Sequence, residues 1–114
     1  MRPVRILLFC FCLFLLTSCG SNQPRDLIIG KWEMIQGEGA EPVMEEFTRD
    51  GKVITYASGK KFKEGAYKLT DDNKIEFMDK PGDNPHATYR LKVTANELIL
   101  ISGDNREEKF KRVN

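Results

Sequence analysis

The side chains that could do covalent chemistry are few: three cysteines and one histidine in 114 residues. Cys19 is the most informative, since it directly follows an apolar segment over 6–16 and two small residues. A cysteine thiol at the end of such a segment is a candidate for acylation. Cys10 and Cys12 lie inside the apolar segment and are interpreted as apolar fillers. With His86 as the only histidine, nucleophile–histidine catalysis and a multi-histidine metal site are both disfavoured, and the sequence predicts neither an enzyme nor a cofactor.

The first 19 residues have the organisation of an export signal. Arg2 and Arg5 precede the apolar segment, whose eleven residues are too few to span a hydrocarbon core about 30 Å thick. The sequence Leu16-Thr17-Ser18-Cys19 resembles a bacterial lipobox. The resemblance implies that residues 1–18 are a signal peptide, that cleavage occurs before Cys19, and that its thiol and new N-terminus are acylated. The alternative is an ordinary secretory signal that happens to contain a cysteine.

The remaining chain is one small domain with balanced charge. Without Arg2 and Arg5 it has 16 basic and 17 acidic residues, which gives no electrostatic case for nucleic acid. Residues 19–27 are polar, contain Pro24 and are predicted to form the lipid anchor and a flexible tether, with the folded domain over 28–114. The expected location is therefore outside the cytoplasm, anchored by Cys19 to the bacterial cell membrane or outer membrane.

Short runs of β-branched and aromatic residues, separated by turn residues, follow the tether. Turn signals include Asp50-Gly51, Ser58-Gly59 and Pro81-Gly82. The predicted strands cover 28–36, 43–48, 52–57, 65–70, 74–78, 87–93, 97–102 and 106–113. Eight closely spaced strands predict an all-β fold, a small antiparallel up-and-down β-barrel, because closure removes exposed edges.

Two strands do not show a simple alternation of apolar and polar residues. Strand 97–102 is apolar on both faces, so its inward set cannot be chosen from the pattern. In strand 43–48, Val43 and Phe47 place Glu45 on the apolar face. Either a β-bulge shifts the alternation, or Glu45 is a polar group directed into a cavity.

Loop lengths predict that the two ends of the barrel differ. Connections 49–51, 71–73 and 94–96 are short and should close one end, called the floor. Connections 37–42, 58–64 and 79–86 are longer and should surround the other end, called the mouth, while 103–105 is short. The first strand starts at the floor, so the tether should leave there and the mouth should face away from the membrane.

The sequence Gly30-Lys31-Trp32, eight meandering strands and an arginine on the last strand resemble the lipocalin family, in particular small bacterial lipocalin-like lipoproteins. The hairpin at 47–53 and the strand segment 65–69 support the likeness, which covers about 28–114. The resemblance implies that Trp32 plugs the floor and that Arg112 packs across its ring, with Gly30 beside them as part of a structural floor. Lipocalins are longer than this domain, so a shallower barrel is expected.

The candidate binding residues lie toward the mouth. Tyr56, Phe62, Met78, His86 and Tyr89 are predicted to surround the opening of a ligand pocket, although aromatic and methionine residues in so small a domain can instead form its core. In segment 60–63 three lysines surround an aromatic residue, which suits an anionic ligand, a lipid headgroup or simply a solvated charged loop.

Adjacent carboxylates give no sign of acid–base chemistry. Glu45-Glu46 and Glu107-Glu108 are neighbours on strands, where successive side chains point to opposite faces. The sequence therefore predicts a cell-envelope lipoprotein that binds a small apolar molecule or lipid without catalysis. The alternative is a solid barrel that binds another envelope protein, as an inhibitor or assembly factor.

Overall fold

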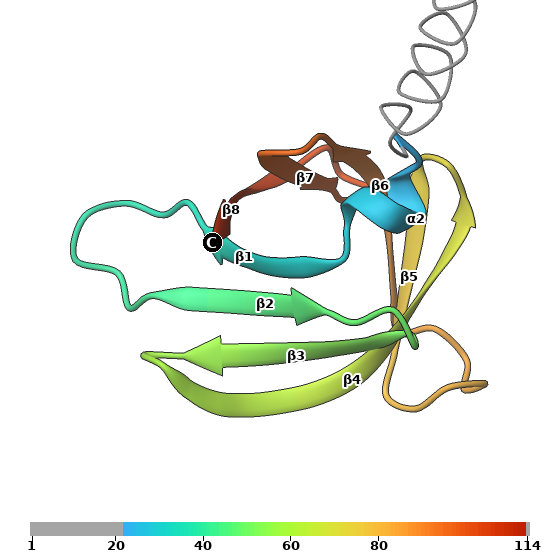
Figure 1. The fold of residues 1–114 in the computed structure, drawn as a ribbon, viewed down its shortest axis with the longest axis horizontal. Coiled ribbons are helices and arrows are strands. Elements are labelled where there is room, and N and C mark those ends of the chain that lie inside the picture. The colour runs from blue at the N-terminus through green and yellow to red at the C-terminus, as the bar shows by residue number, and fades with distance from the viewer. Residues whose placement is uncertain (1–21, 114) are drawn as a thin grey trace, which may run out of the picture.

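The fold is a single closed barrel, seen in a computed structural model that describes residues 22–113. Cys19 and the predicted signal peptide lie outside the described residues. All eight strands are antiparallel, each is hydrogen-bonded to its neighbour in sequence, and β1 pairs with β8 to close the sheet (Figure 1). The predicted all-β, eight-stranded up-and-down barrel is thereby confirmed. Within the described residues, no helix is long and apolar enough to cross a membrane.

The strands follow the predicted order with small shifts in their ends. They are β1 (Gly30–Met34), β2 (Val43–Phe47), β3 (Lys52–Ala57), β4 (Lys60–Asp71), β5 (Lys74–Met78), β6 (Ala87–Val93), β7 (Glu97–Ile101) and β8 (Glu107–Val113).

The largest difference from the prediction is the connection between β3 and β4. The predicted long loop over 58–64 is wrong, because Ser58 and Gly59 alone form the turn, with φ angles of 51° and 81°. Positive φ at both central residues matches the twist of a two-residue hairpin. The register shifts where Thr55 faces Lys63, so β4 carries an irregularity there. That irregularity and the run of charged residues hide the strand alternation in the sequence.

Residues 24–27 form a helical turn, α2 (Pro24–Leu27), inside the segment predicted as a tether. Pro24 stands in the first turn of α2, where its missing N–H costs no hydrogen bond. Ile28, directly after the turn, is fully buried in the core. The chain is thus packed against the barrel before β1 begins.

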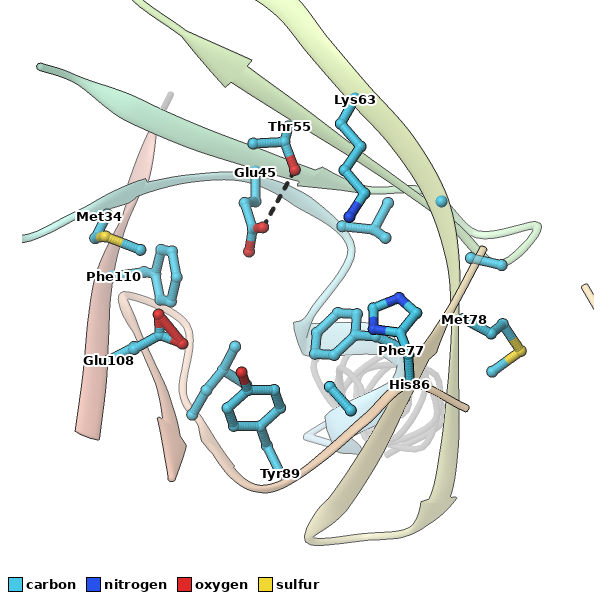
Figure 2. A pocket seen from close by; sticks show the side chains of 15 residues that line it. Met34, Glu45, Thr55, Lys63, Phe77, Met78, His86, Tyr89, Glu108 and Phe110 are labelled. Carbon is cyan, nitrogen blue, oxygen red and sulfur yellow. Dashed lines mark hydrogen bonds between the residues drawn. The ribbon is translucent and has the colours of Figure 1, made fainter. Parts of the chain in front are cut away.

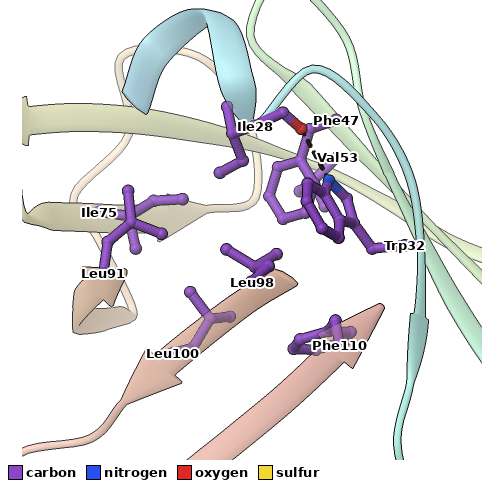
Figure 3. Packing of buried hydrophobic residues seen from close by; sticks show 9 residues of the cluster. All are labelled: Ile28, Trp32, Phe47, Val53, Ile75, Leu91, Leu98, Leu100 and Phe110. Carbon is purple, nitrogen blue, oxygen red and sulfur yellow. Dashed lines mark hydrogen bonds between the residues drawn. The ribbon is translucent and has the colours of Figure 1, made fainter. Parts of the chain in front are cut away.

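The floor half of the barrel is filled with side chains (Figure 3). Trp32 is 0% exposed, and its Nε1 donates a hydrogen bond of 2.9 Å to the carbonyl oxygen of Ile28. In β7, the strand with two apolar faces, Leu98 and Leu100 belong to this core. The core cluster consists of Ile28, Trp32, Phe47, Val53, Ile75, Leu91, Leu98, Leu100 and Phe110.

Arg112 covers the indole ring of Trp32 and ties the helical turn to the barrel. Its guanidinium carbon lies 4.2 Å from the ring centroid. The same guanidinium donates hydrogen bonds to the carbonyl oxygens of Leu27, Ile29 and Ala95. Gly30 has φ +130°, and a Cβ there would stand 2.7 Å from Nη1 of Arg112, so a side chain at this position would displace the arginine.

We expect Arg112→Met to lower the free energy of unfolding by about 3 kcal/mol, since it removes a cation–π contact and leaves three carbonyl oxygens without a donor. Urea unfolding would measure the change. Lys111→Met is the matched control, because Lys111 forms an exposed ion pair with Glu33 at 3.7 Å, and losing this pair should change stability little. Equal midpoints for the two variants would show that Arg112 does not hold the floor.

Candidate functional site

The mouth half of the barrel contains a cavity of about 220 Å³ that opens to solvent. Its inner wall rests on the filled core, because Val53, Leu100 and Phe110 belong to both. All eight strands contribute to it. The lining residues are Met34, Glu45, Val53, Thr55, Lys63, Gly65, Ala66, Phe77, Met78, His86, Ala87, Tyr89, Leu100, Glu108 and Phe110.

Aromatic rings form part of the cavity wall. Phe77 and Tyr89 meet edge to face with 5.7 Å between ring centroids. Phe77 also packs on Phe47 at 6.2 Å, so the wall continues into the core. Such contacts hold the rings in place without a bound molecule. A largely apolar wall with a few polar groups is the usual composition of a small-molecule site.

Glu45 points into the cavity, as Figure 2 shows. Residues 43–47 of β2 pair in unbroken register with β3, and 44–47 do so with β1. The β-bulge considered as one explanation for Glu45 is therefore wrong. The alternation places Glu45 inward between Val43 and Phe47, where Thr55 donates a hydrogen bond of 3.3 Å to Oε1. The sequence signal that identified this residue was its polar character on an apolar face.

A second carboxylate, Glu108, faces the same cavity from β8 (Figure 2). The pKa of Glu45 is raised, mainly by burial. The hydrogen bond from Thr55 and the charge of Lys63 lower this pKa, whereas the charge of Glu108 raises it further. Burial also raises the pKa of the Tyr89 hydroxyl, and Glu108 and Glu45 add to that rise. Tyr89 thus keeps its proton at neutral pH and can donate a hydrogen bond within the cavity.

Lys63 and His86 lie at the exposed rim of the cavity. Lys63 comes from β4 and directs its amine toward the cavity (Figure 2), but the residue is exposed. His86 ends the loop after β5, and its Nε2 lies 3.7 Å from Oδ1 of Asp79, outside a hydrogen-bond distance. Solvent screens charges in such positions, so they influence the cavity less than the two carboxylates do.

Three of the five residues predicted at the pocket mouth line the cavity, and two do not. His86 and Tyr89 face it, and Met78 lies at its edge with its side chain turned away in Figure 2. Tyr56 instead donates a hydrogen bond of 3.1 Å to Glu46, with the amine of Lys31 5.6 Å from its ring centroid.

Phe62, the remaining predicted mouth residue, is 74% exposed and is not a lining residue. Sequence reasoning also missed Thr55, on β3, and Glu108, on the distant strand β8. Glu108 carried a signal, since the inward position of Phe110 also assigns Glu108 to the inner face.

A wider depression lies at the floor end, beside α2, with a volume of about 530 Å³. Arg25, Asp26, Arg49 and Lys68 are among its lining residues. Arg49 and Asp26 form an ion pair of 3.2 Å there, and the Arg49 side chain is largely exposed. Charged and open surroundings of this kind suit solvent better than an apolar molecule.

The raised pKa of Glu45 predicts a pH-dependent stability. A folded-state pKa above the ordinary value of 4.5 means that the folded protein binds the proton more tightly, so stability falls as the pH rises from about 4.5 through the folded-state pKa. Glu45→Gln should remove this loss. The difference in the free energy of unfolding between Glu45→Gln and the natural sequence should therefore shift in favour of the variant as the pH rises through this window. Above the window the difference should stay constant. Urea unfolding at several pH values would measure it.

Glu46→Gln is the matched control for this prediction, because it removes the same charge from the outer face of β2. An identical pH profile for the two variants would contradict the effect assigned to Glu45.

Comparison with protein-family models, with curated proteins and with solved structures finds no match to the chain. Among the described residues, no group of three or more histidine, cysteine, aspartate or glutamate side chains is placed to hold a metal ion.

Proposed function

We propose that this chain is a cell-envelope lipoprotein whose lipocalin-like barrel binds a small, largely apolar molecule in its mouth cavity. The observation that carries the proposal is the division of the barrel interior into a packed floor half and a hollow mouth half. An eight-stranded barrel is just wide enough for one small ligand. A volume of about 220 Å³ equals that of about seven liquid water molecules, so the ligand is small or inserts one end.

The residues of the floor support the lipocalin-like part of the proposal. Gly30 and Trp32 lie at the start of β1, and Arg112 stacks on the indole ring at 4.2 Å, as expected for a lipocalin-like floor. The chain enters the barrel through α2 at this end, which supports a mouth that faces away from the membrane. The proposal assigns no reaction: the protein would act as a carrier or reservoir.

Saturable binding of N-phenyl-1-naphthylamine, a fluorophore that brightens in apolar surroundings, would test the proposal. The fragment 22–114 suits this experiment, since residues 22–113 include all eight strands and the packed core. We expect Ala87→Phe, which fills the cavity, to weaken binding by about tenfold or more. Thr88→Phe is the matched control on the opposite face of β6 and should bind as the natural sequence does. Equal binding by both variants would place the fluorophore elsewhere.

Two exposed apolar side chains favour the second candidate function, a module that binds another envelope protein. Ile35 and Phe62 are 52% and 74% exposed; Ile35 directly follows β1, and Phe62 is near the start of β4. Large apolar side chains that are exposed in the free protein often mark a surface that binds another protein. Phe62→Ala should leave fluorophore binding unchanged if the cavity is the site. Failure of every apolar probe to bind would favour the interaction module.

A further inference from the structure

We propose that the mouth cavity selects small amphipathic amines, holding the ammonium group between Glu45 and Glu108 and the apolar body against the aromatic wall. This inference rests on the proposed function and adds the chemical class of the ligand. Figure 2 shows both carboxylates directed toward the same space, with Phe110 beside them and Tyr89 across from them.

The positions of Glu45 and Glu108 leave room for a cation beside them in the cavity. Among residues 22–113, neither Glu45 nor Glu108 takes part in an ion pair. Lys63 attracts Glu45 only at longer range and is itself exposed. A half-buried pair of like charges is unfavourable, and a cation bound between them would relieve the repulsion.

The cavity wall gives an independent reason for a cation with an apolar body. Phe77, Tyr89 and Phe110 supply aromatic rings, whose faces attract ammonium groups in partly desolvated sites. The same rings, together with Val53 and Leu100, would contact the apolar part of the ligand. An anionic ligand would meet Lys63 and His86 only at the solvent-exposed rim and would be repelled further in.

Three probes of nearly equal size and different charge test the inference: phenethylamine, 2-phenylethanol and phenylacetate. The full-length chain in phosphatidylcholine nanodiscs would be titrated with each probe by calorimetry, with empty nanodiscs as the blank. We expect phenethylamine to bind about tenfold or more tightly than 2-phenylethanol, and phenylacetate to bind most weakly, since a hydrogen bond to a charged group contributes about 1.5–3 kcal/mol.

Glu45→Gln and Glu108→Gln should each weaken phenethylamine binding by about tenfold or more and should change 2-phenylethanol binding much less. Alcohol binding that is retained shows that the variant still folds and keeps its cavity. Glu46→Gln and Glu107→Gln are matched controls, because they remove the same charge from the outer faces of β2 and β8. Both should bind phenethylamine as the natural sequence does.

Equal affinity for amine and alcohol, or amine binding that survives both inward substitutions, would overturn the selection of amines and leave apolar binding intact. Tightest binding of phenylacetate would also overturn the selection of amines and would indicate that the charge of Lys63 governs the cavity. Failure of all three probes to bind would overturn the amine inference and the proposed function together.

Discussion

Trp32→Ala is expected to lower the free energy of unfolding by about 3–5 kcal/mol, the usual cost of removing a large buried aromatic side chain. Trp32 is completely buried, and its loss also removes the hydrogen bond to Ile28 and the surface on which Arg112 stacks. Small domains have total stabilities of about 5–15 kcal/mol, so this change is a large share. Urea unfolding followed by circular dichroism would measure it.

Phe62→Ala is the control for this prediction, because it also removes an aromatic ring, but from an exposed position. We expect its midpoint to stay near that of the natural sequence. A Trp32→Ala midpoint that hardly moves would mean that the floor does not depend on this side chain, and the proposed likeness to lipocalins would lose its main support.

Cys19→Ala is expected to abolish lipid attachment completely and to leave an unprocessed precursor. The reason is the run of basic, apolar and small residues that ends at Cys19, since the thiol is the proposed acylation site. Several acyl chains, each CH₂ contributing about 0.8 kcal/mol when buried in the membrane, would make the anchor effectively permanent. Labelling with radioactive palmitate, together with the apparent mass of the product, would measure both effects.

Cys12→Ala is the matched control for lipid attachment, because it removes a thiol from within the apolar segment. Its labelling should equal that of the natural sequence. Palmitate incorporation that persists in Cys19→Ala would contradict the lipoprotein proposal without bearing on the barrel.

The barrel could be predicted because its strands carry local signals. Short runs of β-branched and aromatic residues, bounded by turn pairs such as Asp50-Gly51, identified all eight strands, and closure follows from the cost of exposed edges. The sequence did not reveal that β4 extends back to Lys60. Residues 60–64 are almost all charged, and their pairing with β3 depends on the turn at 58–59 rather than on an apolar face.

The candidate site could be predicted only in part, because it is assembled from all the strands. His86 and Tyr89 could be predicted because the strand order and loop lengths place them toward the mouth end of the barrel. The placement of Glu45 and Glu108 in one cavity could not be found in the same way, since they face the same space only after β1 and β8 close the sheet. Whether the interior is filled or hollow depends on side-chain volumes that alternation does not specify.

An amide chemical-shift map of fragment 22–114, titrated with 2-phenylethanol, tests the central claim most directly. A neutral probe reports on the cavity itself, whichever charge the natural ligand carries. We expect saturable shifts concentrated at the mouth, around Glu45, Ala87 and Tyr89. Shifts centred on the floor turns, near Asp50, Asp72 and Asn96, or no saturable shifts at all, would contradict it.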